Sequence, residues 1–126
     1  MADIGSANVL RTVPYVTIHH GAAPGANTDF ATDFTVGAAV TALRITACLS
    51  TSSVLNMMQS DGSNENAMSL NAGDALTANA LYTFTVGVRR TDDGTETGDF
   101  LVYNFQVATD SVIETFMVEG ITGGVV

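Results

Sequence analysis

The chain lacks lysine, so arginine supplies all four of its basic residues against thirteen acids. The formal net charge at pH 7 is −9. Nucleic-acid backbones and anionic membranes are held by clustered cations, which displace counterions when they bind. Arg89 and Arg90 are neighbours on an expected strand, so their side chains point to opposite faces and form no patch. The sequence therefore predicts neither nucleic acid nor membrane as a partner.

Cysteine, tryptophan and long apolar runs are also scarce. The single cysteine, Cys48, excludes an intrachain disulfide and a cysteine-based zinc site, and we interpret it as a buried, inert thiol. No uninterrupted apolar run approaches the roughly 18 residues that a bilayer span requires. The first residues, MADIGSANVL, show no basic segment followed by an apolar one, so we expect no signal peptide.

Charge of either sign is sparse. Charged residues make up 13% of the chain, whereas soluble domains carry about 25%, and the mean hydropathy is +0.27. A chain of 126 residues fits one domain that buries roughly two-thirds of its unfolded surface. More apolar surface is present than a small monomer usually hides. The composition therefore predicts a homo-oligomer or a docked state in which companions cover part of the surface.

Runs of alternating apolar and polar residues indicate β-strands. They cover residues 9–20, 41–49, 54–59, 67–70, 81–94, 100–107 and 112–121. Pro14 lacks the N–H of a central strand, so the first run belongs at an edge or a bulge. Residues 36–47 also fit a helix, but their β-branched side chains favour a strand. Short turns join most runs, which predicts an all-β antiparallel sandwich, jelly-roll-like, with seven or eight strands.

Two pairs of runs are expected to form hairpins. Residues 54–59 and 67–70 flank a turn that opens with Asp61-Gly62. Residues 81–94 and 100–107 alternate in the same way, so that their apolar sets would form one wall of the core. The reverse face of that hairpin carries Thr83 and Thr85 and is poor in charge, which makes Phe100 and Val102 interface candidates. The alternative is that a loop or the N-terminal strand of the same chain covers this face.

The connection at residues 71–80 is open between a single helical turn capped by Asp74 and an extended crossover.

The first forty residues are expected to behave differently from the rest. We divide the single domain into an N-terminal arm with edge strands (1–40), which reaches a neighbouring subunit, and a β-sandwich body (41–126). The arm is apolar and suited to strand addition at an edge. Its candidate interface residues are Val9, Val13, Tyr15, Val16 and Ile18.

Signals for catalysis or metal binding are weak. His19 and His20 diverge on a strand and cannot easily grip one metal ion. Asp29 and Asp33 read as solvated acids, and the acidic turns at 61–66 and 91–99 do not fit EF-hand spacing. No nucleophile signature such as G-x-S-x-G is present. We therefore predict no catalytic residue, no cofactor and no metal site.

A family resemblance adds a biological setting. The segments LNAGDALTANALYTFTVGV (70–88), YNFQV (103–107) and VIETFMVEGI (112–121) resemble small virion proteins of tailed bacteriophages, especially capsid decoration or cement proteins. The resemblance covers about residues 41–122. It implies a non-enzymatic β-rich subunit, commonly trimeric, that binds the major capsid protein on the capsid exterior and clamps neighbouring capsid subunits. It also implies synthesis in the host cytoplasm before assembly into the virion.

Two alternatives remain open. One is a receptor- or glycan-binding head domain of a tail fibre or adhesin, which needs exposed aromatics such as Tyr15, Phe30 or Phe34. The other is a small hydrolase, which needs a histidine clustered with a carboxylate.

Overall fold

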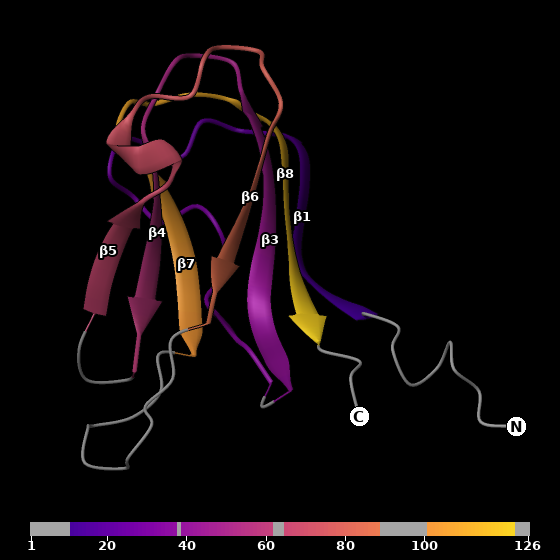
Figure 1. Ribbon diagram of the computed structural model, residues 1–126. Helices are drawn as coiled ribbons and strands as arrows, with labels where there is room; N and C mark the ends of the chain where they lie inside the picture. Colours follow the sequence, from indigo (N-terminus) through magenta and orange to yellow (C-terminus); the bar gives the residue numbers. More distant parts are fainter. Residues whose placement is uncertain (1–10, 38, 62–64, 89–100, 123–126) are drawn as a thin grey trace, which may run out of the picture.

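The chain folds into two antiparallel sheets that pack face to face (Figure 1). The computed structural model describes residues 11–37, 39–61, 65–88 and 101–122. Its strands are β1 (Arg11–Gly21), β2 (Phe34–Thr35), β3 (Val40–Leu49), β4 (Leu55–Ser60), β5 (Glu65–Ser69), β6 (Tyr82–Gly87), β7 (Val102–Val107) and β8 (Ile113–Thr122), with one 3-10 turn, η1 (Asn71–Gly73). In these ranges no helix has the length and apolar character that crossing a membrane takes.

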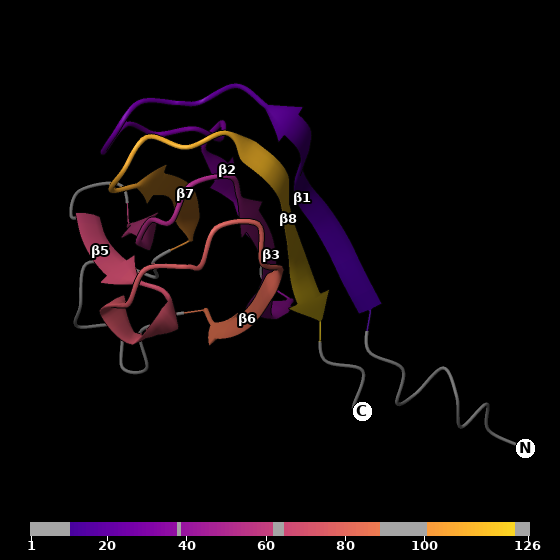
Figure 2. The ribbon, with the colours of Figure 1, turned by 90° about the horizontal axis from the view of Figure 1, so that it is seen from above.

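The strand order is that of an eight-stranded jelly roll. One sheet runs β1-β8-β3-β6 and the other β2-β7-β4-β5. The strands pair as nested partners, first with last and so on inward: β1 with β8, β2 with β7, β3 with β6 and β4 with β5. A long antiparallel ribbon that wraps around a core produces this order. Figure 2 shows the two layers from above. The predicted all-β, jelly-roll-like sandwich is therefore confirmed.

The predicted hairpin of residues 81–94 and 100–107 is wrong. Strand β6 pairs with β3 in one sheet, whereas β7 pairs with β4 and β2 in the other. The alternation did identify the buried faces, because Phe84 on β6 packs against the core and Phe105 on β7 is fully buried. These faces form opposite walls of the core, since alternation reports burial and carries no information about which strand is the neighbour.

The structure also decides the predictions for residues 36–47, 54–70 and 71–80. Strand β3 replaces the helical alternative for residues 36–47, and its inward residues Leu43 and Ile45 are 1% and 0% exposed. The hairpin of β4 and β5 is confirmed by their antiparallel pairing. The connection that follows contains the helical turn η1, but Leu70 occupies its N-cap and Asp74 lies at its C-terminal end. Of the two open alternatives the helical turn is present, and Asp74 is its C-cap residue, whose backbone N–H donates to the Asn71 carbonyl.

Strand β1 lies at the edge of its sheet, where Pro14 was expected. Its pairing with β8 shifts register between Pro14 and Val16, which marks a bulge. His20, near its other end, has a φ of 54°, in the left-handed region. The regular edge backbone is thus interrupted twice, at the bulge and at His20. Prolines and bulges of this kind discourage another strand from adding to an edge.

Residues 25–36 cover the outer edge of the second sheet. The backbone N–H of Asn27 donates to the Val107 carbonyl at 2.7 Å, and that of Phe30 donates to the Phe105 carbonyl at 3.1 Å. Strand β2 continues this pairing along β7. An irregular segment therefore satisfies the backbone groups of β7, which protects this edge from pairing with another chain.

Aromatic rings join the two sheets across the core. The rings of Phe116 on β8 and Phe105 on β7 meet edge to face, with centroids 4.9 Å apart. Phe30 packs against Phe116 at the same distance. Nearer the β1 edge, Tyr15 stacks on Phe34 at 4.8 Å. Edge-to-face and stacked pairs contribute about 0.5–1.5 kcal/mol each beyond their burial, so this cluster holds β1, β7, β8 and the covering segment together.

We expect Gly120→Ala to lower the free energy of unfolding by about 1–3 kcal/mol, because an added methyl group would overpack the core. A Cβ at Gly120 would lie 2.7 Å from Cε2 of Tyr15 and 3.1 Å from both Cγ atoms of Val40. Gly87→Ala is the matched control, because a Cβ there meets nothing within 4 Å. Urea unfolding followed by circular dichroism measures both variants, and equal losses would contradict the steric explanation.

Candidate functional site

The outer face of the β1-β8-β3-β6 sheet is a regular surface formed by four strands. Its residues alternate with the buried positions of β3 and β8, so they point away from the core. Residues directly opposite each other in an antiparallel pair share a face, which extends the surface to β1 and β6. We call this surface the threonine face. It comprises Thr12, Pro14, Thr17, His19, Ala42, Arg44, Thr46, Cys48, Thr83, Thr85, Gly87, Thr115, Met117, Glu119 and Ile121. The expectation of a buried thiol is wrong, because Cys48 is half-buried at an outward position of β3.

Cross-strand rows give the threonine face its pattern. One row runs across the sheet through Thr17, Met117, Thr46 and Thr83. The row beside it runs through Pro14, Glu119, Arg44 and Thr85. Threonine and methionine side chains offer methyl groups with few charges, and depletion of charge is the compositional signature of interface cores. The face thus shares one property with interface cores, its scarcity of charge.

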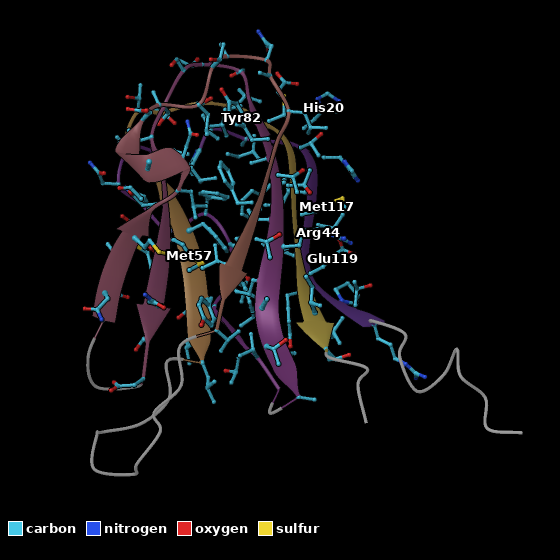
Figure 3. The ribbon with its side chains drawn as sticks, viewed as in Figure 1. His20, Arg44, Met57, Tyr82, Met117 and Glu119 are labelled. Carbon is cyan, nitrogen blue, oxygen red and sulfur yellow. The ribbon has the colours of Figure 1, made fainter. Side chains whose placement is uncertain are left out.

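One ion pair supplies the charges at the centre of the threonine face. Nε and Nη2 of Arg44 donate to Oε1 of Glu119 at 3.2 and 2.8 Å. The side chains are 43% and 23% exposed, so solvent screens the pair and it stabilises the fold by at most about 1 kcal/mol. Figure 3 shows Arg44, Glu119 and Met117 close together on the β3 and β8 side, with Met57 on the other sheet. The centre of the face is therefore electrically neutral.

Negative charge collects elsewhere on the described surface. The remaining described acids lie in connecting segments, on β5 or at the start of β8: Asp29, Asp33, Asp61, Glu65, Asp74, Asp110 and Glu114. Glu114 is paired with His20, whose Nδ1 lies 3.3 Å from Oε2. The threonine face is thus a neutral surface on a strongly acidic protein.

The interface residues predicted on the first strand mostly face inward. Tyr15, Val16 and Ile18 pack against the chain's own core, and Val13 is 39% exposed. Val102 is half-buried on β7, in the opposite sheet. Val9 and Phe100 lie outside the described residues. Contact between these residues and a neighbour stays a prediction, and of the described ones Val13 presents the most exposed side chain.

Of the candidate catalytic groups, His20 lies beside a carboxylate, whereas Asp29 and Asp33 each contact an amide side chain. His20 pairs with Glu114 at the end of the sheet, with 81% of its own side chain exposed. Asp29 accepts a hydrogen bond from Gln106, and Asp33 accepts one from Asn104, so both serve the segment that covers β7. Within the described ranges no three His, Cys, Asp or Glu side chains are grouped to hold a metal ion.

Serine hydroxyls cluster near the end of β3, where they join loops. The Oγ atoms of Ser50 and Ser111 are 3.3 Å apart. Ser111 also accepts from the backbone N–H of Thr51, and Ser50 accepts from that of Val112. These bonds satisfy backbone donors between strands, which is a structural role.

The phenol of Tyr82 has a lowered pKa. Hydrogen bonds from the side chain and the backbone N–H of Thr77 lower the pKa of its phenol, because they stabilise the phenolate. Its ring stacks on Phe84 with centroids 6.0 Å apart. Figure 3 places Tyr82 at the start of β6, away from His20. The hydrogen bond ties the 71–80 connection to β6.

The sequence predicted only a small part of the threonine face. It recognised Thr83 and Thr85 as a charge-poor surface, but assigned them to a hairpin with the wrong partner. Thr17, Thr46 and Met117 lie far apart in the sequence and become neighbours only through the jelly-roll pairing. The available signal was the run of small uncharged residues at the outward positions of each strand.

No family model, curated protein or solved structure matches this chain.

Proposed function

We propose that this chain is a structural virion protein that binds the outside of a phage capsid and stabilises contacts between major capsid protein subunits. The threonine face is the observation that carries the proposal. A neutral sheet surface on an acidic protein is suited to being covered by protein, because docking there removes few charges from water. The jelly roll beneath it supplies a rigid support.

The arrangement of polar groups agrees with a structural role. The His20–Glu114 pair, the Asp33–Asn104 contact and the Ser50–Ser111 contact lie in separate parts of the fold. A protein that acts by attachment needs no reacting groups. A decoration protein touches several capsid subunits, so weak individual contacts combine into strong retention.

Described aromatic side chains give the glycan-binding alternative little support. Tyr15 stacks on Phe34, and Phe30 packs between the sheets. Each is at most half exposed. A carbohydrate platform needs an open aromatic ring, so capsid attachment is the better proposal.

Co-sedimentation with capsids tests the function. Capsids assembled from the major capsid protein of the same genome should bind the purified chain saturably and withstand heating longer. Thr46→Asp should weaken retention by about tenfold, because it adds a charge to the threonine face. Asn66→Asp, on an exposed position of β5, adds the same charge to the other sheet and should leave retention unchanged. Absence of saturable binding by the unmodified chain would refute the proposal.

A further inference from the structure

We infer that the threonine face is where a second copy of this chain docks, so that two subunits pair face to face about a two-fold axis. The inference rests on the proposed function in one respect: both treat this face as a surface covered by protein. It goes further by identifying the occupant before a capsid is bound: a second copy of the chain, which capsid protein replaces on this face. Three properties of the face support it: its charge, the hydrogen-bonding groups that the Arg44–Glu119 pair leaves over, and its area.

Charge restricts where two copies can meet. Each copy carries a formal charge of −9, so contact through its acidic regions would place like charges together. A two-fold contact brings the same patch of both copies together, and such a patch must be neutral or complementary to itself. The centre of the threonine face meets this condition, because its positive Arg44 and negative Glu119 lie side by side.

The ion pair retains donors and an acceptor for a second copy. Nε and Nη2 of Arg44 both donate to Oε1 of Glu119, so the other carboxylate oxygen, Oε2, accepts neither of these bonds. Across a two-fold axis near the pair, Arg44 of each copy can reach the free oxygen of the other copy's Glu119. Two intrachain pairs then become a ring of four alternating charges. The neighbouring row of Thr17, Met117, Thr46 and Thr83 supplies methyl groups around this ring.

The available area suits a weak dimer. The face is four strands wide, with about 4.8 Å between strands, and about eight residues long, with about 3.4 Å per residue. Its area is therefore roughly 500 Å² per copy. Two copies would bury about 1,000 Å², which is near the lower limit for a specific interface. We therefore expect a dimer that dissociates on dilution, although area alone does not set its affinity. Edge-to-edge pairing through β1 is the poorer route, since the Pro14 bulge and the left-handed His20 interrupt its backbone.

Charge reversal and mixing test the inference directly. Sedimentation velocity at increasing concentration should show the unmodified chain passing from 13.1 kDa to twice that mass. Arg44→Glu gives each copy two acids at the centre of the face, and Glu119→Arg gives each copy two arginines. Each variant alone should dimerise more than about 30-fold less tightly, because like charges would meet. An equimolar mixture of the two should associate, since the acidic face of one complements the basic face of the other.

Two further variants control for side effects. The double variant Arg44→Glu/Glu119→Arg restores both charges in exchanged positions and should dimerise like the unmodified chain. Arg11→Glu changes the net charge as much as Arg44→Glu does, but at an exposed position off the face, and should preserve the dimer. Circular dichroism verifies that each variant is folded.

The outcomes separate this inference from the proposed function. A monomer at all concentrations, a trimer, or a dimer that neither single reversal weakens would overturn the face-to-face pairing. If such a protein still binds capsids saturably, the proposed function stands without it. A dimer that follows the charge pattern but does not bind capsids would support the pairing and refute the proposed function.

Discussion

Replacing Phe116 with alanine should lower the free energy of unfolding by about 3–5 kcal/mol, which is a large part of the stability of a small domain. Phe116 is fully buried on the central strand β8. Its ring meets Phe105 of the opposite sheet and Phe30 of the covering segment, each at a centroid distance of 4.9 Å. Truncation would remove the contacts that join three parts of the fold and leave a cavity between the sheets.

Two comparisons isolate the cause of this loss. Phe116→Leu keeps most of the apolar volume and should cost about 1–2 kcal/mol. Leu81→Ala removes an apolar side chain that is 67% exposed, and should change stability by less than about 0.5 kcal/mol. Urea unfolding followed by circular dichroism is the appropriate measurement, since the chain has no tryptophan. A loss below 1 kcal/mol for Phe116→Ala would show that the sheets are not joined through this ring.

Alternation in the sequence predicted the strands and their buried faces because burial of one side leaves a mark on every second residue. Leu43 and Ile45 on β3 illustrate this success. Pairing leaves no comparable mark. Phe84 and Phe105 face the core whether their strands are neighbours in one sheet or lie in opposite sheets. In a jelly roll, consecutive strands often cross between sheets, so proximity in sequence suggested the wrong partner for β6.

The sequence predicted that some surface would be poor in charge, but it did not show which residues make up that surface. Scarcity of charge indicated that some face would be covered, and Thr83 and Thr85 were recognised as part of such a face. The Arg44–Glu119 pair joins residues that are 75 positions apart, and neither partner stands out in the sequence. The strand order alone brings them together and makes the centre of the face neutral.

Asn104→Ala should cost about 2–3 kcal/mol, because it leaves backbone donors without an acceptor in a buried site. Asn104 is 5% exposed. Its Oδ1 accepts from the backbone N–H groups of Ala31 at 3.2 Å and Phe105 at 2.7 Å, and its Nδ2 donates to Asp33. One amide thus fastens the covering segment to β7. A buried amide whose oxygen and nitrogen both have partners fixes the position of the segment.

Asp33→Ala is the informative control for this site. Asp33 is exposed and accepts only the Nδ2 bond among those made by Asn104, so its removal should cost less than about 1 kcal/mol. Urea unfolding gives both values. Hydrogen exchange at Ala31 and Phe105 should then quicken in Asn104→Ala and remain slow in Asp33→Ala. If the two substitutions cost the same, the link to the carboxylate would be what holds the segment in place, and the backbone donors of Ala31 and Phe105 would matter little. If Asn104→Ala costs more free energy of unfolding than Asp33→Ala, the Oδ1 acceptor of Asn104 is the main contact that holds residues 25–36 along the edge of β7.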